Sequence, residues 1–169
     1  LKTLLHEARQ NEEKMRRFDE LERLLIGAGS LLELVRLLLT EYKLAFGLDV
    51  VTLALLDRDH EATRILEGGL GEVCSGLTLM PSPAPLEALY RESRLPFVGA
   101  FSVADHQSFF NAQPGAIASV ALLPLMRQGE LIGSLHFGSA DLDRYRAGCA
   151  TDFLERLAQI IAICLESAL

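Results

Sequence analysis

Three cysteines and four histidines are the side chains with the widest range of chemistry in this sequence. Cys74, Cys149 and Cys164 form no Cys-x-x-Cys pair and no disulfide-rich pattern. Cys149 and Cys164 fall at opposite ends of one expected helix, too far apart to bridge each other. A redox enzyme needs a resolving thiol within reach of the attacking one. We therefore expect three unpaired thiols without a catalytic role, in a reducing cytoplasm.

The histidines do not have the spacing of a metal site. His6, His60, His106 and His136 include no His-x-x-x-His pair and no cysteine at metal-ligand spacing. His136 falls inside an expected strand, where a hydrogen-bonded core histidine is more common than a ligand. The sequence also has no Gly-x-Ser-x-Gly elbow and no phosphate-binding Gly-x-x-x-x-Gly-Lys loop. We expect no catalytic residue, no metal and no cofactor.

Residues 68–116 form a connection that is long for a compact domain, and from Phe97 onward it combines aromatic and polar side chains. Small-molecule sites have apolar walls with a few polar groups, and this segment supplies both. The alternative is that its phenylalanines fill the face of a sheet and leave the pocket closed. The candidate ligand-binding residues, from this segment and a following strand, are Phe97, Phe101, Asp105, His106, Phe110, Ser119 and His136.

The overall composition is that of one acidic domain. Half of the 169 residues are hydrophobic, which is enough for a sizeable core, and the net charge is −7. An acidic balance disfavours direct nucleic-acid binding and a polybasic membrane contact. The longest apolar runs are too short to span a membrane. Leu1 is not a start methionine, so we expect the chain to be part of a longer protein.

Residues 1–26 have the pattern of a long exposed helix. Its apolar stripe is narrow, close to the seam of a coiled coil, and Asn11 interrupts it. Such a helix either lies solvated on its own domain or pairs with a second copy. We expect a homodimer, with candidate interface residues Leu4, Ala8, Met15, Phe18 and Leu25. Residues 1–29 would then be a dimerisation or signalling helix, and 30–169 the domain.

The remaining elements predict an antiparallel sheet. Ser30 and Glu33 form a capping-box pattern for a second helix, which should end at Gly47. Residues 49–57 read as a strand and 62–69 as its returning partner. Residues 116–126 and 131–139 form a hairpin about Gln128–Gly129, and 152–169 form a closing helix.

The returning strand of that hairpin carries a glycine and a histidine. Alternation places Leu131, Gly133, Leu135 and Phe137 on one face, with Ile132, Ser134 and His136 on the other. A glycine within a strand indicates a bulge or the close approach of another backbone or ligand.

The segments "FGLDVVTLALLDRD", "ASVALLPLMRQGELIGSLHFGS" and "TDFLERLAQIIAICL" together resemble a GAF domain, over roughly residues 30–168. More narrowly, "GSADLDRY" with "TDFLERLA" and the charged helix before the domain is similar to a bacterial GAF-like family of unknown function, domain-of-unknown-function family 484. The resemblance implies an α+β fold with a central antiparallel sheet of about five or six strands. The terminal helices would cover one face and an irregular crossover the other.

The resemblance also implies a pocket beneath the crossover and a helical face often used for dimerisation. The Asn-Lys-x-Phe-x-Asp-Glu motif of cyclic-nucleotide-binding members is absent, because neither Asn11 nor Asn111 precedes a lysine. Some GAF domains reduce free methionine sulfoxide with cysteines around the pocket, and "GEVCSG" about Cys74 has a faint similarity to such a site. We expect a cytoplasmic, non-catalytic module that dimerises and senses a small molecule. A scaffold with a closed pocket is the alternative, and a sulfoxide reductase is a more distant one.

Overall fold

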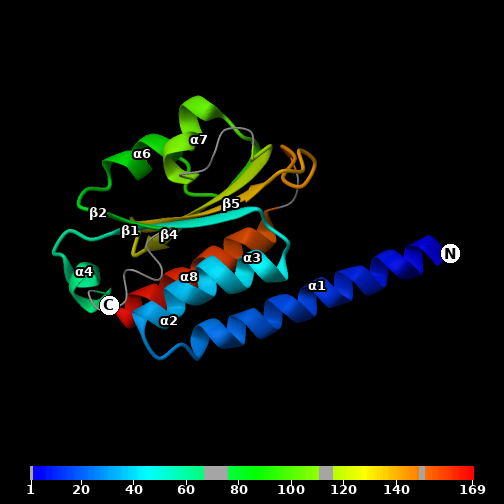
Figure 1. Ribbon diagram of the computed structural model, residues 1–169, viewed down its shortest axis with the longest axis horizontal. Helices are drawn as coiled ribbons and strands as arrows, with labels where there is room; N and C mark the ends of the chain where they lie inside the picture. Colours follow the sequence, from blue (N-terminus) through cyan, green and yellow to red (C-terminus); the bar gives the residue numbers. More distant parts are fainter. Residues whose placement is uncertain (1, 67–75, 111–115, 149–150) are drawn as a thin grey trace.

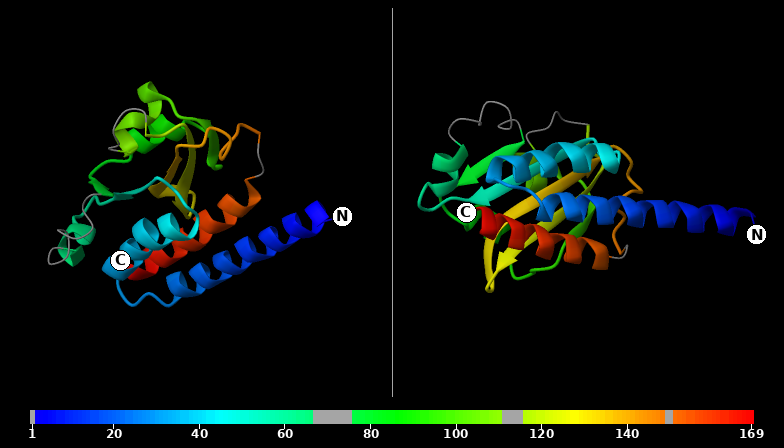
Figure 2. Two further views of the ribbon diagram at one scale, coloured as in Figure 1. Left: turned by 45° about the vertical axis from the view of Figure 1, so that its right-hand side comes forward. Right: turned by 90° about the horizontal axis from the view of Figure 1, so that it is seen from below.

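The computed structural model describes residues 2–66, 76–110, 116–148 and 151–169. Within them, a five-stranded sheet of order β2-β1-β5-β4-β3 lies between two layers of helices (Figures 1 and 2). The strands are β1 Val50–Leu56, β2 Leu77–Met80, β3 Phe97–Ala100, β4 Ser119–Arg127 and β5 Glu130–Ser139. The helices are α1 Lys2–Ile26, α2 Leu31–Arg36, the π-helical turn η1 Leu37–Glu41, α3 Tyr42–Ala45, α4 Glu61–Leu66, α6 Ala84–Tyr90, α7 Val103–Phe110 and α8 Asp152–Ala168. The expected α+β class is confirmed.

The terminal helices cover one face of the sheet. α1, the α2–η1–α3 segment and α8 lie side by side beneath it (Figure 2). Leu135 and Phe137 of β5 are buried in this layer. The Ser30 side chain accepts the Glu33 N–H and caps α2, as its pattern predicts. The helical segment that begins there ends at Ala45 with Phe46 as its cap, and Gly47 follows with a φ of +60°, which suits a residue without a Cβ atom.

The β4–β5 hairpin forms where the sequence predicts it. Gln128 and Gly129 have φ angles of +52° and +79°, as a tight two-residue turn requires. Gly133 lies close against β1, because a Cβ atom there would stand 2.6 Å from the carbonyl oxygen of Ala54. The glycine in this strand therefore allows close contact between two backbones.

A β-bulge next to Gly133 corrects one expectation about side-chain direction. β4 and β5 pair Leu125 with Gly133 but Met126 with Leu131, so Ile132 is the extra residue. Leu131 consequently faces the second layer of helices, opposite to Leu135 and Phe137. Strict alternation predicted the same face for all three, which is wrong because the bulge shifts the phase.

The expected strand at 62–69 is wrong over the part that the structure describes, because residues 61–66 form helix α4. Asp57 directly follows β1, and its carboxylate accepts the backbone N–H groups of Ala62 and Thr63 in the first turn of the helix. Ala62 and Leu66, four residues apart, are buried beside α2. A short apolar run fits either structure, and this local capping favours the helix.

The partner of β1 is instead β2, and it runs parallel to β1. The sheet is therefore mixed rather than wholly antiparallel. A connection that includes α4 brings the chain back before β2 begins, and such a crossover produces parallel pairing.

The opposite face of the sheet is covered by α6 and α7 (Figure 1). This second layer has its own smaller core, in which Phe110 of α7 is 2% exposed and packs with Leu86 of α6 and Leu122 of β4. The described part of the crossover between β1 and β4 is thus more regular than expected, since it contains the helices α4, α6 and α7 and the strands β2 and β3.

Candidate functional site

A chain of buried polar groups runs between the sheet and its second helical layer. Thr52 on β1 donates its hydroxyl to the carbonyl oxygen of Phe109, at 2.7 Å, and lies 2.9 Å from His136 Nδ1. His136 Nε2 lies 2.7 Å from the Ser134 hydroxyl, and that hydroxyl also bonds the Tyr90 hydroxyl. The chain therefore joins α6, α7 and two central strands.

The direction of each hydrogen bond in this network follows from the Thr52 hydroxyl, which donates its only proton to Phe109. Thr52 Oγ1 therefore accepts from His136 Nδ1–H. Neutral His136 then accepts at Nε2 from Ser134, which in turn accepts from Tyr90. The hydrogen-bonding groups of Thr52, Ser134 and His136, the three members of this network that lie on strands, are therefore satisfied without a ligand.

Burial keeps this network uncharged. It lowers the pKa of His136 to about 3 and raises the pKa of Tyr90. His136, proposed from the sequence as a ligand contact, is 1% exposed and serves here as a hydrogen-bonded core histidine. A cavity of about 330 Å³ nevertheless reaches its ring between Ala54, Thr78 and Phe109.

A second histidine, His106, stands at the edge of a larger hollow. The Ser102 N–H donates to His106 Nδ1 at 2.9 Å, so the neutral ring carries its proton on Nε2. Burial lowers the pKa of His106, and the neighbouring Asp105 carboxylate opposes this shift. The ring centroids of Phe97 and Phe101 lie 5.5 and 5.9 Å from that of the imidazole.

This hollow, which we call the α6–α7 groove, has a volume of about 610 Å³. Residues of α6, α7, the edge strand β3 and β4 form its walls, and aromatic and aliphatic side chains are mixed there with polar ones. The lining includes Leu89, Tyr90, Arg91, Phe97, Ser102, Asp105, His106, Phe109 and Leu122. Its volume falls within the range of small-molecule sites.

The structure thus brings together only part of the predicted set. Phe97, Asp105 and His106 line the α6–α7 groove. Phe101 does not line it and packs edge-on against the buried Phe110, at 5.9 Å between centroids.

The Ser119 hydroxyl is also hydrogen-bonded within the protein. It donates to the Asp141 carbonyl oxygen at 2.6 Å and accepts the Tyr145 N–H, away from the groove.

Sequence reasoning missed Tyr90, Arg91 and Thr52. Tyr90 reads as one more apolar residue of a short amphipathic helix, and Thr52 as one of several residues in a buried strand. Arg91 has a φ of +56° just after α6, which no sequence signal marks, because residues other than glycine rarely adopt that conformation.

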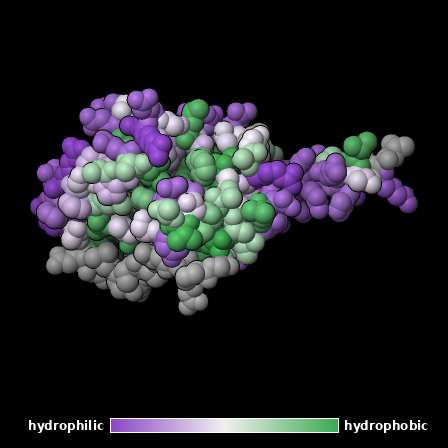
Figure 3. All heavy atoms as spheres, turned by 90° about the horizontal axis from the view of Figure 1, so that it is seen from above, coloured by the Kyte–Doolittle hydropathy of each residue, from purple (hydrophilic) through white to green (hydrophobic). Residues whose placement is uncertain are grey.

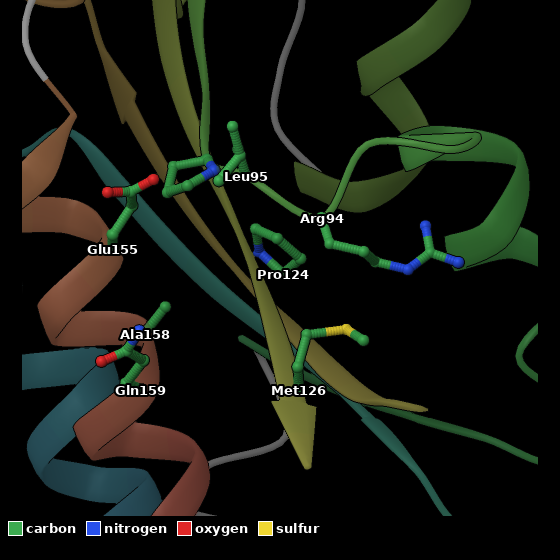
Figure 4. Close-up of a pocket in the computed structure, with 8 residues that line it drawn as sticks. Arg94, Leu95, Pro124, Met126, Glu155, Ala158 and Gln159 are labelled. Carbon is green, nitrogen blue, oxygen red and sulfur yellow. The ribbon is translucent and has the colours of Figure 1, made fainter. Parts of the chain in front are cut away.

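A further cavity, of about 270 Å³, lies between α8, β4 and residues 94–96, which precede β3 (Figure 4). Pro124, Met126 and Ala158 contribute its apolar lining. The Arg94 side chain turns away from α8 and donates to the carbonyl oxygens of Arg91 and Ser93. This cavity therefore offers fewer directed polar groups than the α6–α7 groove.

The predicted dimer residues separate into two groups. Leu4, Ala8 and Met15 are exposed on the half of α1 that projects beyond the domain (Figure 1). Phe18 instead stacks on Phe46 at 4.2 Å, and Leu25 is 1% exposed in the core. Phe18 and Leu25 are therefore corrected from interface candidates to residues that attach α1 to its own domain.

Metal and thiol chemistry find little support in the residues that the structure describes. No group of three His, Cys, Asp or Glu side chains there could hold a metal ion. Cys164 is half-buried on α8, on the side of the sheet away from the α6–α7 groove, and burial raises the pKa of its thiol. Cys74 and Cys149 lie outside the described residues. Among the described helices, none is long and apolar enough to cross a membrane.

Solved structures with this fold include several GAF domains. The GAF domain of a phosphoenolpyruvate-protein phosphotransferase from Coxiella burnetii has a TM-score of 0.63 at 16% identity, covering 93% of this chain and 95% of that one. The corresponding Acinetobacter domain has a TM-score of 0.60 at 13% identity, covering 92% and 94%.

Another neighbour is an enzyme with the same fold. The free methionine-R-sulfoxide reductase from Neisseria meningitidis, solved in complex with its substrate, has a TM-score of 0.60 at 17% identity, covering 92% of this chain and 89% of that one. These similarities establish a GAF-like fold. No curated protein matches the sequence significantly. The sequence matches a family described as "Protein of unknown function, DUF484" over residues 1–168. The chain therefore belongs to the DUF484 family, whose fold is here that of a GAF domain.

Proposed function

We propose that this chain is a non-catalytic, cytoplasmic signalling module that binds a small molecule in the α6–α7 groove and forms a homodimer through the projecting half of α1. The observation that carries the proposal is the combination, in one groove, of aromatic walls with the oriented imidazole of His106. Sensing modules need both features, since apolar walls provide affinity and a fixed polar group provides orientation.

The groove suggests the chemistry of its ligand. His106 Nδ1 is occupied by the Ser102 N–H, so Nε2–H is the remaining polar atom of the ring and acts as a donor. Phe97 and Phe109 offer aromatic surface, and Arg91 adds a cation to the lining. A planar ring bearing a carbonyl or carboxylate acceptor matches this set.

The proposal is tested by thermal unfolding with nicotinamide, nicotinate and benzamide at millimolar concentration. A compound present at ten times its Kd should stabilise the chain by about 1.4 kcal/mol, which raises the Tm by about 3–6 °C in a domain of this size. His106→Phe keeps a ring but removes the donor, and Phe97→Ala removes aromatic surface. Both variants should lose the rise in Tm.

The matched control is Val103→Ala, since Val103 is exposed on α7 but does not line the groove. This variant should keep the full rise. If none of the three probes raises the Tm of the unaltered chain, or if His106→Phe responds as the unaltered chain does, this ligand-binding function is wrong.

A scaffold with a closed pocket is the second candidate, and one observation favours it. Directly beneath α7, Phe110 packs against Ile117 and Leu122, and the polar chain from Tyr90 to Thr52 is satisfied internally. The space between the helix and the sheet is thus already filled by the protein. A chain without response to the probes that still dimerises would support this function.

The sulfoxide-reductase alternative has less support. The neighbour of that activity shares 17% identity, which carries the fold alone. Cys164 lies in the opposite layer from the α6–α7 groove, so it is poorly placed to act as a resolving thiol there. We therefore propose that the module has no redox turnover.

A further inference from the structure

The apolar stripe of α1 continues past the edge of its own domain. From Phe18 to Leu25 the helix is held to the domain, with Glu22 paired to Arg156 of α8. From Lys2 to Arg17 every side chain is exposed, including Leu4 at 69% and Met15 at 54%. This projecting segment of α1 is about 24 Å long. Figure 3 shows that it carries hydrophobic as well as hydrophilic residues beyond the body of the molecule.

The residues of the projecting segment follow the register of a coiled coil. Leu4, Ala8, Asn11 and Met15 alternate in steps of four and three, which places them on one seam. Glu7 and Lys14 flank this seam on one side, one heptad apart, and Glu12 flanks it on the other. Glu13 lies on the far side of the helix.

We infer that the projecting segment pairs antiparallel with the same segment of a second copy of this chain. Pairing Leu4 with the second copy's Met15, and Ala8 with its Asn11, overlaps the two segments over their whole length. A slip by one heptad would shorten the overlap or drive the helix into the partner domain. The inference rests on the proposed homodimer and specifies its orientation.

Charge complementarity selects the antiparallel orientation. In an antiparallel pair, flanking residues of the same side meet, so Glu7 faces the second copy's Lys14 twice by symmetry. In a parallel pair, Glu7 would instead face Glu12 of the other chain, and two carboxylates would repel each other. The small Ala8 also leaves space for the Asn11 amide opposite it in the antiparallel register.

The first test is the dimer dissociation constant of charge variants, measured by analytical ultracentrifugation at low salt. Glu7→Lys should weaken an antiparallel dimer roughly 3–10-fold, because two attractive contacts become repulsive. The same change would tighten a parallel dimer, since lysine would then face Glu12. The double variant E7K/K14E should restore the original affinity. Glu13→Lys is the matched control, with the same change in charge on the far side, and should leave the dissociation constant unchanged.

Disulfide trapping provides an independent readout of orientation. In a background with Cys74, Cys149 and Cys164 replaced by serine, Leu4→Cys and Met15→Cys chains are mixed and oxidised. Antiparallel pairing predicts Leu4–Met15 cross-links, because like residues would be about 16 Å apart along the axis. Cross-links between like residues, with tightening by Glu7→Lys, would overturn the orientation while leaving the dimer intact. A chain that stays monomeric at high micromolar concentration would overturn both the orientation and the dimer.

Discussion

Thr52 Oγ1 and His136 Nδ1 lie 2.9 Å apart on neighbouring strands, although 84 residues of chain separate them. Because the Thr52 proton is donated to Phe109, this contact determines which nitrogen of His136 carries a proton. The pair ties the second helical layer to the centre of the sheet.

Stability should depend on pH through His136. Burial lowers its pKa to about 3 in the folded state from 6.5, so the unfolded chain binds the proton more readily. The stabilising contribution of neutral His136 is therefore complete above about pH 6.5 and is lost as the pH falls toward 3. The free energy of unfolding changes by at most about 1.4 kcal/mol per pH unit for this one proton.

The measurement is urea unfolding between pH 5 and 7.5 for the unaltered chain and for His136→Gln, which cannot titrate in this range. His106 contributes in the same direction in both proteins, since burial also lowers its pKa. The difference between the two slopes isolates His136. Equal slopes would contradict the buried neutral histidine.

The close approach of β5 to β1 should make Gly133 intolerant of a side chain. Gly133→Ala places a Cβ atom 2.6 Å from the Ala54 carbonyl oxygen, which only a backbone shift can relieve. We expect a loss of about 1–3 kcal/mol in the free energy of unfolding, or more if the strands separate.

Gly129→Ala is the comparison, because the space around Gly129 is open and only its φ of +79° resists the change. Its cost should be about 1 kcal/mol. Urea denaturation of both variants decides the point, and a Gly133 variant as stable as the Gly129 variant would count against this strand contact.

Removing residues 1–17 should abolish the homodimer without unfolding the domain. The deletion takes away the exposed Leu4, Ala8 and Met15 but leaves Phe18 and Leu25, which pack on the domain. Light scattering should report twice the 18.6 kDa monomer mass for the whole chain and a monomer for the shortened one. An unchanged association state after the deletion would place the interface elsewhere.

Replacing Cys74 by serine should leave ligand binding and the association state unchanged. The sequence offers Cys74 no neighbouring thiol partner, and the described Cys164 lies in the other helical layer. The assay is thiol-dependent reduction of free methionine sulfoxide by the whole chain, for which we expect no turnover. Robust reduction that disappears in Cys74→Ser would establish the enzyme instead.

Local signals were sufficient for the elements whose determinants lie close together in sequence. The Gln128–Gly129 turn, the Ser30 cap and the end of a helical segment before Gly47 depend on residues within a few positions of each other. The stripe of α8 likewise repeats within one helix. Such patterns act through backbone conformation and neighbouring side chains, so they can be recognised without knowing the fold.

The candidate site required the tertiary structure. Sequence reasoning found Phe97, Asp105 and His106 because they cluster in one segment. It missed Tyr90 on α6 and Thr52 on β1, which belong to the buried hydrogen-bonded network and lie far from that segment in the sequence. It also included Phe110 and Ser119, whose side chains are occupied by the protein itself.

What the sequence alone determined about this protein is its α+β class, the hairpin, the long N-terminal helix and the approximate segment of the groove. Only the tertiary structure decided that 61–66 is helical, that β2 runs parallel to β1, and that Leu131 faces the second layer. It also decided that Leu25 is buried in the core and that Phe18 packs against that core on its own domain. The reason is physical: periodicity is set by neighbours along the chain, whereas burial, pairing direction and hydrogen-bond partners depend on which distant segments the topology brings together.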